Sequence, residues 1–174
     1  MTKQLIYTLI AMCLVLGFAK PLNKAFAAES TEPAVGQNNV FYTINSQRIN
    51  RVKILSDFFK SFDGPLEPYS AAFVRIADKY ELDYRLLPSI ACLESSCGKF
   101  YIKNSNNPFG WGIYGNTVTS FKTVEECIEA VAKGLSTNYV AKGYETVEEI
   151  AVIYNPSNSV KWAGNVRYFY DKIN

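Results

Sequence analysis

Apolar side chains recur at helical spacing through most of the chain after residue 48, and one stretch, residues 99–122, breaks that pattern. Apolar positions that repeat every three or four residues predict amphipathic helices with one buried face. The interrupting stretch is rich in glycine and asparagine, which favour turns, and two short extended pieces are expected there at 111–114 and 117–121. The sequence therefore predicts a mainly α-helical domain over residues 48–174 with a small irregular or β lobe.

Turn and capping signals delimit the expected helices. Glycine and proline end helices, and a threonine followed three residues later by a glutamate forms a capping box that begins one. The expected helices run from Arg48 to a turn at Asp63-Gly64-Pro65, from about Leu66 to Tyr80, from an Asp83 cap to Gly98, from Thr123 with Glu126, from Thr146 with Glu149, and from Val160 to Ile173.

Residues 1–27 are typical of a signal peptide. Lys3 supplies a positive start, residues 5–19 carry no charge, and Ala25-Phe26-Ala27 fits the small-x-small pattern that precedes a cleavage site. Without cleavage the apolar run would act as a membrane anchor, although it is short for a full span. The polar residues 28–47 predict a flexible linker. We therefore expect a secreted or cell-wall protein without stable membrane association once the leader is removed.

Charge and histidine content exclude several classes of function. Beyond residue 27 the chain carries 15 basic and 16 acidic residues with no basic patch, so we expect no nucleic-acid partner. Histidine is absent, which removes the commonest general base, the histidine-dependent nucleophile arrangements and histidine-based zinc sites. Catalysis would depend on carboxylates, tyrosine, lysine or cysteine, and no metal or cofactor is implied.

The three cysteines beyond the leader leave their pairing open. Cys92 and Cys97 could bridge only if the helix ends between them, since side chains five apart on a continuous helix diverge. Cys127 with either of them is equally possible, and so are three small buried thiols.

A carboxylate near the end of an apolar helix is the strongest candidate for chemistry. Ile90 and Ala91 should share a face with Glu94 and could place it at a groove edge with apolar walls. Desolvation there would raise its pKa and keep it protonated, as a general acid requires. A helical glutamate is more often a solvated surface group, so this placement alone does not decide the function.

The segments LLPSIACLESSCGK, NSNNPFGWGIYG, FKTVEECIEAVAKGL and YNPSNSVKWAGNVRYF occur in this order from Leu86 onwards. Together they resemble the bacterial glucosaminidase-type branch of the lysozyme-like superfamily, over roughly residues 65–173. The resemblance implies a lysozyme-like fold and a monomeric enzyme that cleaves the glycan strands of peptidoglycan without a cofactor.

The resemblance also implies the site residues. Glu94 matches the catalytic acid, and Tyr154 matches the aromatic residue that faces it. Asn107, Phe109 and Gly110 match a loop that lines the sugar cleft. Trp111 and Tyr114 lie in the same loop and, with Phe109, could form a stacking wall, although core packing of at least one ring is as probable. Tyr154 and Trp162 could line the far wall of the cleft, although helical spacing favours a core position for Trp162.

The sequence departs from a two-carboxylate glycosidase in one respect. Such an enzyme needs a second Asp or Glu across the scissile bond, and residues 99–124 contain neither. Glu125 and Glu126 are better explained as the N-terminal charges of a helix. The chain is therefore expected to use a single acid, as lytic transglycosylases and substrate-assisted hydrolases do. The alternatives are a catalytically inactive glycan-binding module and, with less support, a thiol enzyme built on Cys97, which no base accompanies.

Overall fold

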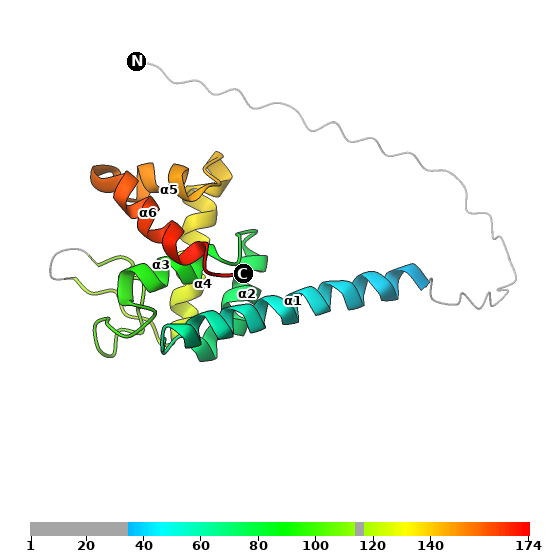
Figure 1. Cartoon of the computed structure of the whole chain (residues 1–174). Coiled ribbons are helices and arrows are strands. Elements are labelled where there is room, and N and C mark those ends of the chain that lie inside the picture. The colour runs from blue at the N-terminus through cyan, green and yellow to red at the C-terminus, as the bar shows by residue number, and fades with distance from the viewer. Residues whose placement is uncertain (1–34, 114–116) are drawn as a thin grey trace, which may run out of the picture. The chain divides into compact units, whose positions relative to one another are not determined.

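Helices account for nearly all the regular structure in the computed structural model, which describes residues 35–113 and 117–174 (Figure 1). The α-helices are α1 (Val35–Ser61), α2 (Ser70–Lys79), α3 (Leu86–Ser95), α4 (Val124–Asn138), α5 (Val147–Tyr154) and α6 (Ser159–Tyr170), and the short 3-10 helices are η1 (Glu67–Tyr69), η2 (Val140–Lys142) and η3 (Pro156–Asn158). The prediction of a mainly α-helical fold is confirmed. Between α3 and α4 the described residues are irregular, with an isolated bridge residue at Thr117.

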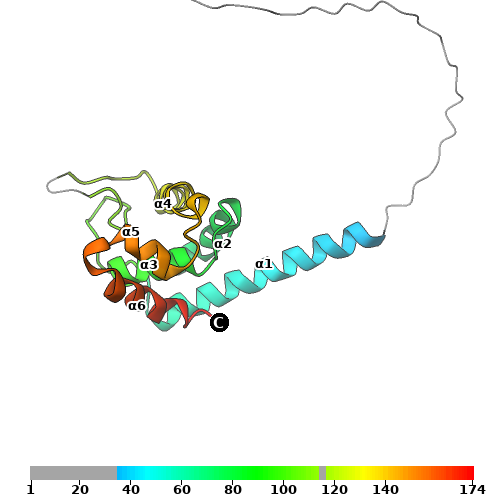
Figure 2. The same ribbon diagram turned by 90° about the horizontal axis from the view of Figure 1, so that it is seen from above.

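The first helix is longer than the sequence suggested. Helix α1 begins at Val35, so the expected linker is corrected over residues 35–47, which are helical. Figures 1 and 2 show this part of α1 extending beyond the other helices. Helix propagation costs little once a packed segment has nucleated the helix, and Leu55 and Phe59 of α1 are fully buried. The predicted signal peptide and residues 28–34 lie outside the part of the chain that the structure describes.

One hydrophobic core joins all six α-helices. Large side chains from each helix are fully buried in it, and each such side chain contributes about 1.5–3 kcal/mol. These include Leu55 and Phe59 of α1, Phe73 and Ile76 of α2, Leu87 and Ile90 of α3, Ile128 and Leu135 of α4, Ile150 of α5, and Val166 of α6. Ile49, which helical spacing placed on the same face of α1, is exposed because it precedes the part of the helix that packs on the core.

The helix starts show which capping predictions were right. Thr123 accepts a hydrogen bond from the Glu126 N–H at the start of α4, and Thr146 forms a complete capping box with Glu149 at the start of α5, as predicted. Asp83 is not the cap of α3: its carboxylate accepts the backbone N–H of Arg85, and Arg85 is itself the cap residue. Asp83 thus holds the turn that precedes the helix.

Helix α3 ends at Ser95, between two cysteines that form a disulfide, Cys92–Cys97. Ser96 and Cys97 adopt left-handed backbone conformations with φ of 53° and 59°, and this turn brings the two sulfurs together. Cys127 is a buried free thiol. The helix end that the disulfide required is therefore present, and pairing through Cys127 is excluded.

No helix within residues 35–113 and 117–174 is long and apolar enough to cross a bilayer.

Candidate active site

Glu94 lies in the last turn of α3, and its carboxyl is bound by a residue from α6. The indole Nε1 of Trp162 donates a hydrogen bond to Glu94 Oε1 over 3.2 Å. Although Glu94 as a residue is exposed, protein atoms surround its carboxyl closely enough that desolvation raises its pKa. The hydrogen bond from Trp162 acts in the opposite direction but is the smaller effect. The environment therefore favours the protonated acid, as the apolar helix end suggested.

Tyr154, the last residue of α5, packs against the same tryptophan. Its ring stacks on Trp162 with centroids 4.7 Å apart and an interplanar angle of 28°. The rings of Trp111 and Tyr139 lie farther out, at 6.4 Å and 6.3 Å from Tyr154. The sequence expected Tyr154 to face Glu94 directly. The structure places Trp162 in contact with both residues, so the indole connects the acid to an aromatic cluster.

An open groove of about 310 Å³ lies beside this cluster. It is lined by Gly110, Trp111, Gly112, Ile113, Tyr139 and Tyr154. The groove thus brings together three of the residues that the sequence singled out, Gly110, Trp111 and Tyr154. Gly110 has a φ of +62° and a side chain added there would meet nothing within 4 Å, so the wall is open at that point.

Trp111 is held in the groove wall from behind by helix α4. A Cβ at Gly134 would lie only 2.5 Å from Cζ2 of the Trp111 ring. Real Cβ atoms do not approach another atom so closely, because of steric repulsion. The glycine at this position in the helix therefore makes room for the indole.

Asn107 does not line the groove, which corrects the prediction that it binds sugar. Its side chain is buried, and the amide is used within the loop. Nδ2 donates to the backbone carbonyls of Trp111 and Thr119 at 2.9 Å each, while Oδ1 accepts the backbone N–H of Trp111 at 2.9 Å. Asn107 therefore fixes the loop that carries Trp111, and the same donor and acceptor chemistry that suits an N-acetyl group serves the backbone instead.

Phe109 is also corrected from a sugar-binding residue to a core residue. It is 2% exposed, and its ring lies 6.4 Å from that of Phe73 in α2. Burial of this ring anchors the irregular lobe to the helical core. Tyr114, the remaining predicted stacking residue, lies outside the described residues.

Sequence reasoning missed Tyr139 and the contact that Trp162 makes with the acid. Tyr139, which follows α4, lines the groove, and Trp162 binds Glu94. The prediction that Trp162 is buried is right, since it is 5% exposed. A buried tryptophan nevertheless needs a partner for its N–H, and this requirement was the available signal for a contact with a polar group.

The two acids that follow the lobe are engaged elsewhere. Glu125 pairs with Arg75 of α2 at 3.1 Å, and the Glu126 carboxylate accepts the Lys122 N–H at the start of α4. The groove residues that the structure describes include no carboxylate, and the undescribed residues 114–116 are Tyr, Gly and Asn.

Among residues 35–113 and 117–174, no group of three or more potential metal ligands is close enough to hold an ion.

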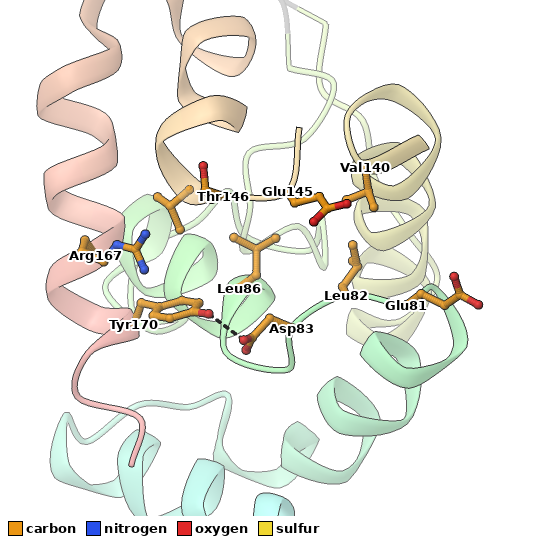
Figure 3. A pocket seen from close by; sticks show the side chains of 10 residues that line it. Glu81, Leu82, Asp83, Leu86, Val140, Glu145, Thr146, Arg167 and Tyr170 are labelled. Atoms are coloured by element: carbon orange, nitrogen blue, oxygen red, sulfur yellow. Dashed lines mark hydrogen bonds between the residues drawn. The ribbon is translucent and has the colours of Figure 1, made fainter. Parts of the chain in front are cut away.

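A second cavity, of about 480 Å³, lies where the N-terminal end of α3 meets the C-terminal end of α6 (Figure 3). Asp83 and Tyr170 face one another in it, with the Tyr170 hydroxyl donating to Asp83 over 2.6 Å. Arg85 also donates to Asp83 through its side chain. None of the predicted site residues lines this cavity, and among its polar side chains Asp83 and Tyr170 bind each other while Arg167 pairs with Glu148.

Comparisons with protein-family models and with curated proteins found no match to this chain. The lysozyme-like resemblance therefore depends on the four sequence segments alone. The structure adds the hydrogen bond between Trp162 and Glu94 and the aromatic groove next to Tyr154.

Proposed function

We propose that this protein cleaves the β-1,4 glycan strands of peptidoglycan, with Glu94 as the general acid. The observation that carries the proposal is the Glu94 carboxyl itself, which has a raised pKa and is bound by an indole that also supports an aromatic groove. Burial raises the pKa of this carboxyl above its ordinary value, which favours the protonated form that a general acid needs.

The groove has the chemistry of a sugar site. Aromatic rings offer flat apolar faces to the C–H groups of a pyranose, while their hydroxyl and N–H groups can bond to sugar oxygens. Trp111, Tyr139 and Tyr154 provide such rings around a groove whose volume of about 310 Å³ is within the range of small-molecule sites. N-acetylated sugars of a glycan strand fit this lining better than a charged ligand would, because no charged side chain is among the described residues that line the groove.

In the proposed reaction, Glu94 protonates the leaving glycosidic oxygen as the bond from that oxygen to C1 breaks. Tyr154 orients the sugar that develops oxocarbenium character. Because the described residues that line the groove include no carboxylate to act opposite Glu94, the substrate's own group attacks C1. Attack by the 2-acetamido oxygen leads to hydrolysis, whereas attack by the 6-hydroxyl gives a 1,6-anhydro product.

The test is digestion of purified peptidoglycan, followed by mass spectrometry of the released muropeptides. The proposal predicts new glycan ends, and the terminal sugar identifies the bond that is cut and the route of attack. A protein that binds the polymer but releases no fragment is the inactive glycan-binding module, and that result contradicts the proposal.

Peptidoglycan lies outside the cytoplasmic membrane, so the proposed activity requires export. The signal pattern over residues 1–27 supports it. N-terminal sequencing of the extracellular protein is expected to begin near Ala28. Retention of the apolar run in the membrane fraction would instead support an uncleaved anchor.

A further inference from the structure

We propose that Trp162 is a positioning residue that selects which oxygen of Glu94 carries the catalytic proton. The inference rests on the proposed function and extends it to a residue for which helical spacing favoured a core position. It follows from the direction of one hydrogen bond, the confinement of its donor, and the charge change that accompanies proton transfer.

The direction of the bond assigns the two carboxyl oxygens. An indole N–H can only donate, so Glu94 Oε1 must present a lone pair to Trp162 Nε1. The carbonyl oxygen of a neutral carboxylic acid is a better acceptor than its hydroxyl oxygen, so this bond favours the arrangement with the proton on Oε2. Without this contact either oxygen could carry the proton. Only some of the protein molecules would then have the proton on the oxygen from which it is transferred to the substrate.

The donor is confined by its surroundings. Trp162 is 5% exposed, and the ring of Tyr154 is stacked on its face at 4.7 Å. An indole N–H lies in the plane of the ring, so fixing the ring also fixes the direction of the bond. A sugar bound against the groove side of Tyr154 would thus be supported by the same indole that orients the acid.

The charge change gives the bond a catalytic effect. When the Oε2 proton moves to the glycosidic oxygen, the C1–O electron pair goes to that oxygen and Glu94 becomes a carboxylate. Hydrogen bonds to an ionised acceptor are roughly twice as strong as those to a neutral one. Trp162 therefore stabilises the state after proton transfer more than the state before it, and this difference lowers the barrier.

The contact can be tested without any activity measurement. The chain contains two tryptophans, so a proton–nitrogen NMR spectrum should show two indole signals, and Trp111→Phe assigns them. We expect the Trp162 indole signal to shift as Glu94 ionises, and to lose that titration in Glu94→Gln. The Trp111 indole signal is expected to remain unaffected by Glu94→Gln. A Trp162 signal that does not respond to Glu94 overturns the inference, whether or not the protein cleaves glycan.

Kinetics test the positioning role. Trp162→Phe retains a ring for Tyr154 but removes the N–H, and kcat should fall roughly 10- to 100-fold with little change in KM. In the wild type the hydrogen bond from Trp162 lowers the pKa of Glu94, so the loss of this bond should raise that pKa further. The high-pH limb of the activity profile, where Glu94 loses its proton, should therefore move to higher pH. If this variant is too unstable to assay, the titration of the wild-type indole still decides the inference.

The two proposals fail separately. Wild-type protein that shows the indole titration but releases no glycan fragment contradicts the proposed function. Wild-type protein that cleaves glycan, together with a folded Trp162→Phe variant of unchanged kcat and pH profile, contradicts the positioning role and leaves the proposed function intact.

Discussion

The indole nitrogen of Trp162 donates a hydrogen bond to Glu94, although 68 positions separate the two residues in the sequence. Helices α3 and α6 pack against each other and create this contact between an apolar segment and an amphipathic one. The site is therefore a product of tertiary packing.

Trp111 should move when the space behind it is filled. Gly134→Ala places a Cβ where it collides with the indole, so we expect weaker glycan binding, measured as a rise in KM or in the dissociation constant of a chitooligosaccharide. Gly164→Ala in α6 is the matched control, because nothing lies within 4 Å of its new Cβ. The control should stabilise the protein by up to about 1 kcal/mol through helix propensity, with unchanged binding. Equal behaviour of the two variants would show that Trp111 does not depend on Gly134.

Asn107 should matter for stability more than its position in a loop suggests. Asn107→Ala leaves the buried backbone groups that it binds without those partners, and we expect a loss of about 2–4 kcal/mol in unfolding free energy. Asn104→Gly is the control: Asn104 is exposed with a φ of 66°, which glycine adopts freely. Chemical denaturation measures both. A loss of binding without a loss of stability in Asn107→Ala would restore the direct sugar contact.

The cluster around Asp83 predicts a pH-dependent contribution to stability. Burial raises the pKa of Asp83, but hydrogen bonds from Arg85 and Tyr170 outweigh it, so that the pKa is lowered overall. A lowered folded-state pKa stabilises the protein above the unfolded value of about 4, and this stabilisation is lost as the pH falls through the folded-state pKa. Asp83→Asn should therefore lower Tm at pH 7, and the difference from wild type should shrink in acid.

Thermal unfolding across pH checks this prediction, with Glu125→Gln as the control. Glu125 and Arg75 form an exposed pair, and such pairs contribute little to stability. A deficit for Asp83→Asn that stays constant down to pH 2 would show that its effect is not electrostatic.

Thiol titration should distinguish the three cysteines. Burial raises the pKa of Cys127 to about 12 and limits access to it, so a thiol reagent should find no reactive cysteine in native protein that lacks the leader. Unfolding without a reductant should expose one thiol, and reduction should expose three. Three reactive thiols without a reductant would mean that Cys92 and Cys97 are not bridged.

The sequence was most informative where structure is local. Both threonine caps and the approximate positions of the helices follow from spacing and from residues a few positions apart. The extent of α1 did not, because residues 35–47 hold a glycine and three asparagines, which are poor helix formers, and their helix continues one that is held by packing farther along the chain.

For the site, the sequence identified Glu94 but misplaced its surroundings. Asn107 and Phe109 were expected to contact sugar, yet an asparagine amide binds backbone as readily as a ligand, and a phenylalanine in a loop can be drawn into the core. Periodicity assigned Trp162 to the core correctly but carries no information about where its N–H points. Those facts depend on which helices meet.

The most direct test of the central claim compares wild-type protein with Glu94→Gln on purified peptidoglycan, with muropeptide release followed by mass spectrometry. Gln keeps the shape of Glu and can still accept a hydrogen bond from Trp162, but it cannot donate a catalytic proton. We predict that release falls by about 10²- to 10⁴-fold while circular dichroism and Tm stay close to wild type. Glu145→Gln, at an exposed position away from the groove, should retain full activity. Near wild-type release by Glu94→Gln would contradict the account.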